Sequence, residues 1–184
     1  MTATPPLTTD RLLDAAEAIM QAMGYAGLSF RDLAARVGIR SASVHYHYPT
    51  KADLGRALTR RYTDRLAARL ATLEACHPPD QALVQYVDIF RSVFLRDGRM
   101  CLCGMLAAEA EAIPTEMRDE LRRFVAVNLS WTARMLERAG PGTRPPGDAP
   151  VLFASLEGAL LLARATGDAS VFDAIEQRLP GRPA

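Results

Sequence analysis

The amino-acid sequence predicts an all-α protein of about nine helices, with a three-helix head at the N-terminus and a helical body after it. Apolar residues recur every three or four positions through most of the chain, as they do on one face of a helix. Gly and Pro interrupt this pattern at short intervals. No segment shows the sustained polar–apolar alternation of a half-buried strand, so the body is predicted to be helical as well.

The first four helices have recognisable ends. Ser29 with Asp32, and Thr50 with Asp53, have the spacing of a capping box at a helix N-terminus. Pro49 ends the third helix, because the residue before a proline disfavours helical backbone. The nine helices are expected at about residues 12–23, 29–37, 40–47, 50–74, 80–96, 100–112, 115–138, 148–167 and 170–178. These ranges divide the chain into a head at 1–50, a connecting helix at 51–74 and a body at 75–184.

Composition excludes several classes of protein. The 184 residues are 49% hydrophobic and 23% charged, which is ordinary for a soluble globular protein. Apolar runs such as 158–163 are far shorter than the ~18 residues of a membrane span, and the N-terminus has no secretion-signal pattern. Three unevenly placed cysteines do not suggest a disulfide framework. We therefore expect a cytoplasmic protein without a membrane partner.

Charge and motif together indicate a double-stranded DNA partner. Residues 1–70 carry ten Lys or Arg against six Asp or Glu, a net charge of +4, although ordinary surface charge would give the same count. Residues 29–47 have the helix–turn–short helix plan in which the second helix enters a major groove. Arg and Ser suit base edges, whereas Tyr, His and Lys suit phosphate oxygens. The predicted DNA contacts are Ser29, Arg40, Ser41, Ser43, His45, Tyr46, His47 and Lys51.

The corner at 45–51 has two interpretations. Its aromatic residues either contact phosphates or fasten the third helix to the head, and for Tyr48 we favour the second. Lys51 is the only lysine of the chain and stands at a helix N-terminus. Such a position disfavours a cation unless an anion is near, so for Lys51 we favour phosphate.

Residues 8–54 resemble the TetR family of regulators. The matching features are Gly24-Tyr25, Leu33-Ala34, Gly38-Ile39, the 45–51 corner and Asp53-Leu54. The resemblance implies a homodimer with one DNA-binding head per subunit, and a body that binds a small molecule and thereby releases a repressed operator. His45 replaces the usual tyrosine, which predicts tighter operator binding at lower pH because a protonated histidine is the stronger phosphate donor.

The stretch at 100–109 is similar to a Gly-Cys-Leu-x-Gly-x-Leu-Ala-x-Glu run in a subset of these regulators that respond to reactive electrophiles or related acids. Met100 replaces the Gly, and Cys101 falls on the cysteine of that subset. Cys101 is therefore either a reactive thiol near a helix N-terminus or a small buried filler. A zinc site of Cys76, His77, Cys101 and Cys103 has suitable residue types but fits no compact zinc module.

Two further sets of residues are expected in the body. Apolar side chains facing inward would line a pocket for a hydrophobic effector, although such residues are more often plain core. The predicted ligand contacts are Phe90, Phe94, Cys101, Met105 and Phe124. The apolar helix at 149–168 is the expected dimer element, with Leu152, Leu156 and Leu160 at the interface, unless that helix is buried within one subunit.

The function that these observations favour is a ligand-responsive DNA-binding repressor. The alternative is a cytoplasmic helical thiol sensor or small-molecule carrier whose head does not bind DNA. An enzyme is disfavoured because no nucleophile–base motif, phosphate-binding loop or His-Glu metal motif is present. No catalytic residue, cofactor or metal is predicted.

Overall fold

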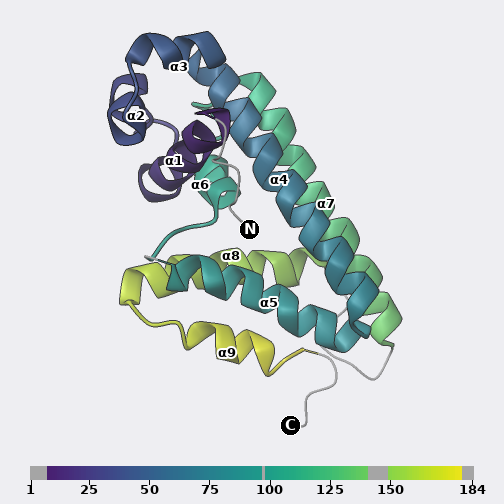
Figure 1. The fold of residues 1–184 in the computed structure, drawn as a ribbon. Helices are drawn as coiled ribbons and strands as arrows, with labels where there is room; N and C mark the ends of the chain where they lie inside the picture. The colour runs from purple at the N-terminus through teal and green to yellow at the C-terminus, as the bar shows by residue number, and fades with distance from the viewer. Residues whose placement is uncertain (1–7, 97, 141–148, 180–184) are drawn as a thin grey trace, which may run out of the picture. The chain divides into compact units, whose positions relative to one another are not determined.

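The computed structural model describes residues 8–96, 98–140 and 149–179, and within these ranges it contains helices and no strand. The element order confirms the all-α prediction (Figure 1). The helices are α1 (Thr8–Met23), α2 (Phe30–Val37), α3 (Ser41–His47), α4 (Lys51–Cys76), α5 (Pro79–Leu95), α6 (Leu102–Ala108), α7 (Thr115–Ala139), α8 (Ala149–Thr166) and α9 (Val171–Glu176).

The chain forms two compact units that are not contiguous in sequence. Unit 1 comprises Met1–Tyr62 and Leu102–Leu121, and unit 2 comprises Thr63–Cys101 and Arg122–Ala184. The boundary therefore falls within α4 and within α7. Helix α6 and the first residues of α7 belong to the same unit as the head, which helical periodicity alone does not reveal.

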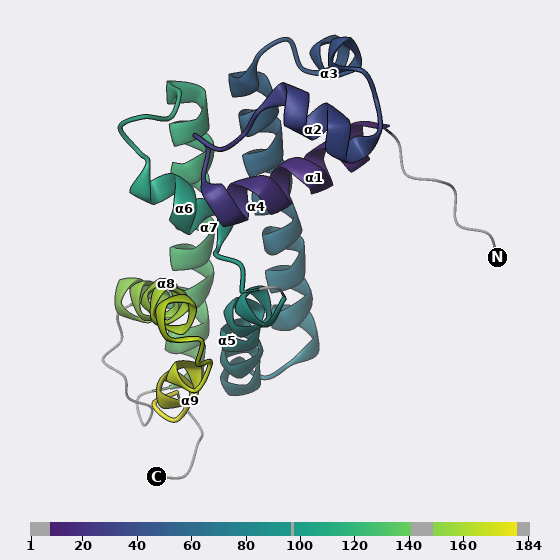
Figure 2. The same ribbon diagram turned by 90° about the vertical axis from the view of Figure 1, so that its left-hand side faces the viewer.

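Unit 1 is built around α1. Helix α1 packs against α2 and α6, and α2 packs against α3 (Figure 2). The apolar core includes Leu12 and Met20 of α1, Leu33 of α2 and Leu106 of α6, all fully buried. At the surface, the Arg61 guanidinium donates to the Asp14 carboxylate at 2.6 Å. Most of the stability of these short helices therefore comes from packing, since helices of two turns are not stable alone.

In unit 2, helices α5, α8 and α9 pack against one another (Figure 1). Its core includes the fully buried residues Tyr86, Phe124, Leu156 and Phe172. Within this unit, the indole N–H of Trp131 on α7 donates to a carbonyl on α4 at 3.1 Å. Aromatic side chains, each with a large apolar area, are thus prominent in this core.

Helix α8 is apolar on more than one face, which changes where a partner could contact it. Leu152, Leu156 and Leu160, the residues predicted for the dimer interface, are between 0% and 4% exposed and lie in the core of their own subunit. Leu161 and Leu162, by contrast, are 61% and 56% exposed. Periodicity identifies apolar stripes but cannot tell which of two stripes packs against α5. The stripe available to a partner is therefore the one that contains Leu161 and Leu162.

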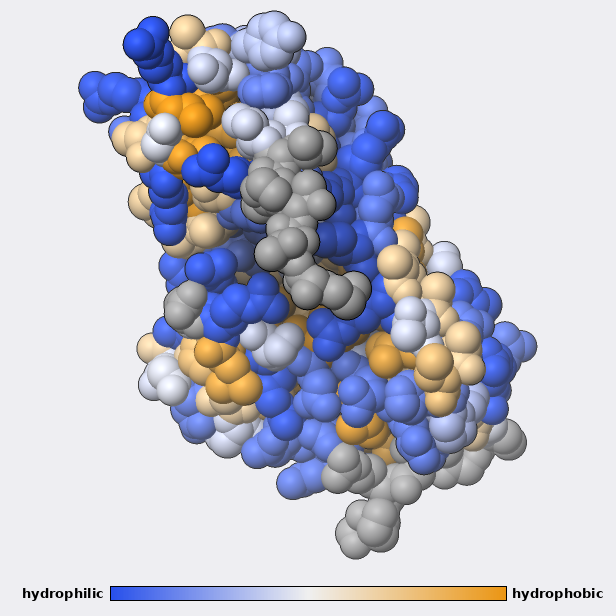
Figure 3. Space-filling model, in the orientation of Figure 1, coloured by the Kyte–Doolittle hydropathy of each residue, from blue (hydrophilic) through white to orange (hydrophobic). Residues whose placement is uncertain are grey.

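Helix α8 is also long and apolar enough, by length and composition, to cross a membrane. Buried core helices pass the same test, and α8 packs against α5 and α9. The face drawn in Figure 3 is mostly hydrophilic, with hydrophobic residues in separate patches. The composition of α8 is thus that of a core helix with one apolar stripe at the surface.

Candidate functional site

The turn between α2 and α3 is fixed by backbone geometry. The Ser29 side chain accepts a hydrogen bond from the Asp32 N–H at 3.4 Å, which caps the start of α2. Gly38 ends α2 in the left-handed conformation, with φ of 75°, and its N–H bonds the carbonyls of Ala34 and Ala35. Only glycine adopts this conformation without strain, so Gly38 sets the direction in which α3 leaves the turn.

Helix α3 presents a polar surface held by one apolar anchor. Val44 is fully buried and is the residue of this seven-residue helix that enters the core. Tyr46 is 84% exposed. The remaining predicted DNA contacts on this segment are exposed or partly exposed; they are Arg40, Ser41, Ser43, His45 and His47. The structure therefore brings together, on one short helix and its N-cap, six of the eight residues predicted to contact DNA.

The corner after α3 is stabilised by reciprocal hydrogen bonds. The Thr50 backbone N–H donates to the Asp53 carboxylate at 3.1 Å, and the Asp53 N–H donates to the Thr50 hydroxyl oxygen at 3.0 Å. This is the predicted capping box. His45 Nδ1 lies 3.3 Å from the carbonyl oxygen of Pro49. Because a carbonyl oxygen can only accept, Nδ1 is the donor of this hydrogen bond. The His45 ring packs edge-on against Phe30, with ring centroids 4.8 Å apart.

Lys51 faces the turn that follows α1. Its ammonium group donates to the Ala26 carbonyl at 3.3 Å and lies 4.4 Å from the centre of the Tyr25 ring. Burial lowers the pKa of Lys51, and the negative charge of Glu109 opposes that shift. Glu109 also accepts a hydrogen bond from the Tyr25 N–H at 2.7 Å. The phosphate contact predicted for Lys51 stays a prediction, and the surroundings of the side chain show that it is already oriented by protein groups.

The body contains a cluster of aromatic rings where a ligand pocket was predicted. Phe90 and Phe124 are 3% and 1% exposed, and both contact Phe153 with ring centroids 6.1 Å apart. Phe94 is partly exposed. Met105 belongs to unit 1, so it does not share the compact unit of the other four predicted contacts.

Cys101 is buried in unit 2, with 1% of its surface exposed. The sequence predicted it inside a helix over 100–112, but α6 begins only at Leu102 and ends at Ala108. Cys101 therefore lies immediately before the helix and not within it. Cys103 is also buried, and Cys76 is exposed. Among the residues that the structure describes, no group of His, Cys, Asp or Glu could hold a metal ion.

A carboxyl group that sequence reasoning missed lies beside the Cys101 thiol. Glu157 on α8 is partly exposed as a residue, but both its carboxyl oxygens are shielded from solvent. Burial raises the pKa of Glu157 to about 7, and a hydrogen bond from Cys101 acts against that rise. A signal was available, because Glu157 is the only charged residue in the apolar segment 149–163.

Tyr86 on α5 completes this polar group. Its hydroxyl donates to the Asn128 side-chain oxygen at 2.7 Å, and the Asn128 amide donates to the Phe124 carbonyl at 2.8 Å. Burial, together with the charges of Glu157 and Cys101, raises the pKa of the Tyr86 hydroxyl, so it stays protonated. The Tyr86 ring packs against Phe90 and Trp131 at 5.3 and 5.1 Å. Unit 2 thus holds a small polar group within an aromatic core.

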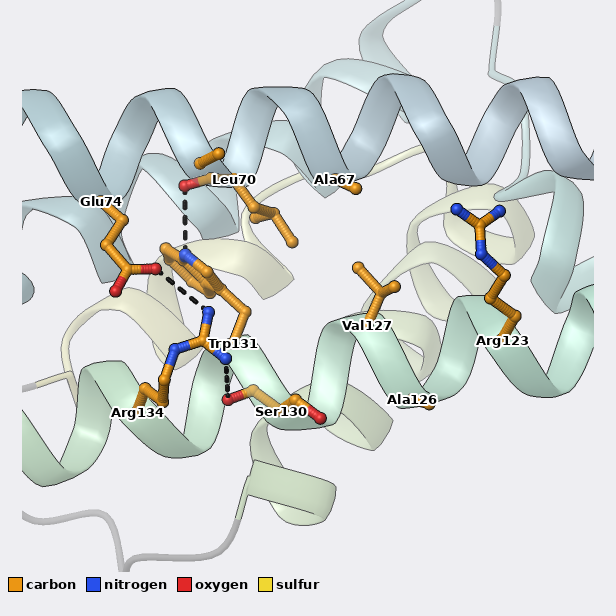
Figure 4. A pocket seen from close by; sticks show the side chains of 10 residues that line it. Ala67, Leu70, Glu74, Arg123, Ala126, Val127, Ser130, Trp131 and Arg134 are labelled. Atoms are coloured by element: carbon orange, nitrogen blue, oxygen red, sulfur yellow. Dashed lines mark hydrogen bonds and ion pairs between the residues drawn. The ribbon is translucent and has the colours of Figure 1, made fainter.

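A hollow of about 370 Å³ lies between the unit 2 parts of α4 and α7 (Figure 4). Small side chains such as Ala67 and Ala126 border it, and the Trp131 side chain reaches from α7 towards α4 at its floor. Its charged residues are paired: Arg134 donates to Glu74 at 3.1 Å, and Arg123 pairs with Asp64. The hollow has no uncompensated group, so the Cys101–Glu157 pair remains the chemically distinctive feature of the body.

Comparison with known proteins places this geometry in a family. Residues 12–58 match the model of the bacterial regulatory proteins, tetR family. The HTH-type transcriptional regulator CymR of Pseudomonas putida is 30% identical over 125 residues, which are 66% of this chain and 59% of CymR.

Two solved structures cover nearly the whole chain. A TetR transcriptional regulator from Legionella pneumophila is 29% identical, has a TM-score of 0.89, and covers 95% of this chain and 96% of its own. A transcriptional regulator of the TetR family from Agrobacterium tumefaciens is 30% identical, has a TM-score of 0.86, and covers 94% of this chain and 97% of its own. These relatives are regulators and not enzymes.

Proposed function

Since this chain belongs to the TetR family of bacterial regulatory proteins, we propose that it is a cytoplasmic repressor that binds a palindromic operator as a homodimer. A small hydrophobic or electrophilic effector releases it from the DNA. The observation that carries this proposal is the exposed polar surface of α3, which is anchored by the buried Val44. Exposed polar residues on the second helix of a helix-turn-helix head are the groups that read a major groove.

Within this head, the proposed contacts fall into two kinds. Arg40, Ser41 and Ser43 lie at the start of α3, where side chains reach base edges. His45, Tyr46 and His47 lie at its end, beside Lys51, and suit phosphate oxygens together with Ser29. Lys51 would exchange its hydrogen bond with the Ala26 carbonyl for one with a phosphate, which is favourable because a charged acceptor is stronger.

Dimerisation is proposed through the exposed stripe of α8. Leu161 and Leu162 are exposed there, and a side chain at Gly158 would meet nothing within 4 Å in the single chain. Small and apolar residues along one exposed stripe allow two helices to approach closely across a two-fold axis. The dimer matters to DNA binding because two heads about 34–36 Å apart can enter successive major grooves.

The effector is proposed to bind in unit 2, between Phe90, Phe124 and Cys101. Phe90 and Phe124 would supply aromatic contacts to such a ligand, and the Cys101 thiol would supply a polar one. Cys101 matches the cysteine of the subset that responds to electrophiles, which supports an effector that the thiol can attack. A ligand that binds one spacing of the two heads better than another shifts the dimer away from the operator.

The test is fluorescence-anisotropy binding of the full chain to the intergenic DNA beside its own gene, at 50 and 200 mM salt. We expect tight, site-preferring binding that weakens steeply with salt, because many phosphates are neutralised. Arg40→Ala should weaken specific binding by about tenfold or more. Arg96→Ala, which removes the same charge from an exposed position of the body, is the matched control and should change little.

Binding that is weak and equal on every DNA would contradict the proposal and favour a sensor or carrier without DNA binding. Leu162→Glu tests the dimer face in the same assay, because a charge on that stripe should give monomers in ultracentrifugation and abolish tight binding. Leu95→Glu is its control, since Leu95 is likewise an exposed leucine, 67% exposed, but belongs to a different helix, α5.

A further inference from the structure

The turn that follows α1 depends on an acceptor from a distant part of the chain. Helix α1 ends at Gly24, which has φ of 73° and whose N–H donates to the Met20 carbonyl at 2.9 Å. This type of helix end satisfies the N–H of the glycine but not that of the next residue. The Tyr25 N–H donates instead to the Glu109 carboxylate at 2.7 Å. A carboxylate is a stronger acceptor than a neutral carbonyl, so Glu109 completes the end of α1.

The position of Glu109 is set by the core of unit 1. Glu109 lies directly after α6, and its N–H donates to the carbonyl of the buried Leu106 at 3.2 Å. Its own carbonyl accepts from the N–H of the buried Ile113 at 3.1 Å. A Cβ at Gly24 would lie 2.0 Å from the Glu109 carboxylate, so a glycine at 24 is what lets the carboxylate reach the backbone of the turn.

Lys51 is attached to the same turn from the start of α4. Its ammonium group donates to the Ala26 carbonyl at 3.3 Å and lies 4.4 Å from the centre of the Tyr25 ring, where a cation is attracted to the ring face. Gly55 lies one turn further along α4, and a Cβ there would lie 3.2 Å from the Tyr25 ring. The Tyr25–Ala26 peptide, which Glu109 fixes at one end, is therefore the support that holds Lys51.

A lysine that binds phosphate benefits from such a support. Its four-carbon stem is flexible, and fixing the stem before the ligand arrives reduces the entropy that binding would otherwise cost. The N-terminus of α4 disfavours the ammonium charge, and burial lowers the pKa of Lys51. The negative charge of Glu109 opposes that lowering and so favours the charged form that a phosphate needs.

We propose that Glu109 is a positioning residue for operator binding, because it fixes the turn that orients Lys51 towards a DNA phosphate. This inference rests on the proposed function, in which Lys51 is a phosphate contact. Glu109 carries a negative charge and cannot itself bind phosphate, so its effect passes through Lys51. A purely structural role would stabilise the turn without any dependence on Lys51, and this difference is what the experiment measures.

The first measurement is fluorescence-anisotropy binding to the intergenic DNA beside the gene, over a range of salt concentrations. We expect Glu109→Ala to weaken binding by about fivefold and Lys51→Ala by about tenfold, with a shallower salt dependence in both. Adding Glu109→Ala to Lys51→Ala should cause no further loss. Glu109→Gln should stay within about threefold of wild type, because its amide oxygen still accepts the Tyr25 N–H. Glu111→Ala is the matched control, since it removes the same charge from an exposed residue two positions away.

The second measurement needs no DNA, because Lys51 is the only lysine of the chain. Reductive methylation with ¹³C-formaldehyde labels Lys51 and the terminal amine, and NMR then follows the titration of the Lys51 signal in the full chain. We expect the pKa of Lys51 to fall further in Glu109→Gln, since the charge that opposes the effect of burial is gone. Glu111→Gln should leave it unchanged.

Four results would overturn the proposal in variants that circular dichroism shows to be folded. They are equal binding by Glu109→Ala and Glu111→Ala, losses that multiply in the double variant, binding by Glu109→Gln as weak as that of Glu109→Ala, and a Lys51 titration that ignores Glu109. Wild type that binds every DNA weakly and equally would remove the proposed function and this inference together. Tight wild-type binding that needs Lys51 but not Glu109 would remove this inference alone.

Discussion

Two glutamates of this chain occupy opposite electrostatic surroundings. In unit 1, the Glu109 carboxylate accepts the Tyr25 N–H at 2.7 Å, and its charge acts on the Lys51 ammonium. In unit 2, the buried carboxyl oxygens of Glu157 have no ordinary donor. In unit 1, the hydrogen bond that Glu109 accepts from Tyr25 holds the turn after α1 in place and stabilises the fold. Unit 2 keeps an acid whose ionisation is costly, which is typical of groups retained for chemistry.

The largest effect expected from this difference is on how stability changes between acidic and neutral pH. The pKa of Glu157 is about 7 in the folded chain against an ordinary value of 4.5. The folded state then binds the proton more tightly than the unfolded state, so stability falls as the pH rises from 4.5 through 7, by about 3 kcal/mol in total. Glu157→Gln removes this titration, and the variant should be more stable than wild type at pH 8 by up to about that amount.

Urea unfolding at pH 5 and pH 8 measures this change. At pH 5 most of the Glu157 penalty is absent in both proteins, so their difference should be small and should widen towards pH 8. Stability curves that run parallel between the two pH values would mean that Glu157 is solvated, and the contrast between the two glutamates would disappear.

A second prediction uses two glycines of unit 1 with nearly the same backbone angle. Gly24 and Gly38 have φ of 73° and 75°, but a Cβ at Gly24 would lie 2.0 Å from a Glu109 carboxylate oxygen, whereas a Cβ at Gly38 would meet nothing within 4 Å. Gly38→Ala should cost about 1 kcal/mol for the left-handed conformation alone. Gly24→Ala should cost about 2–3 kcal/mol, because it also displaces Glu109 from the Tyr25 N–H.

Thermal or urea unfolding of the two variants separates these contributions, since the backbone strain is shared. Equal losses of stability would show that the Glu109 carboxylate moves aside without cost. In that case the hydrogen bond from the Tyr25 N–H to Glu109 would contribute little to stability, and the contrast between Glu109 and Glu157 would be weaker.

The helices could be predicted from the sequence because their signals are local. Capping boxes, glycines and prolines lie within a few residues of the ends that they determine, and the nine expected helices match α1 to α9 closely. Helix α6 was predicted too long, because its apolar spacing continues past the point where the chain turns after Ala108. The assignment of α6 and the start of α7 to the unit of the head depends on long-range packing, which periodicity does not contain.

The sites were predictable to different degrees for the same reason. The residues predicted to contact DNA lie within one short segment, so a local motif was enough to group them. The polar group of the body draws Tyr86 from α5, Asn128 from α7 and Glu157 from α8, and no spacing in sequence relates them. The faces of α8 show the limit most clearly, since Leu160 is fully buried and the adjacent Leu161 is 61% exposed.

The smallest predicted effect concerns the hydrogen-bonded N-terminal cap of α4, which belongs to unit 1. The Thr50 hydroxyl donates to Asp53 at 2.7 Å and accepts from its N–H at 3.0 Å, so Thr50→Ala should destabilise the chain by about 1 kcal/mol. Thr72→Ala is the matched control on the same helix. The Thr72 hydroxyl bonds the Ala68 carbonyl one turn earlier, and alanine is the better helix former there, so its loss should be neutral or slightly stabilising. Equal effects of the two substitutions in urea unfolding would contradict the prediction. A loss confined to Thr50 would mean that the cap fixes the α3–α4 corner, and operator binding should then weaken together with stability.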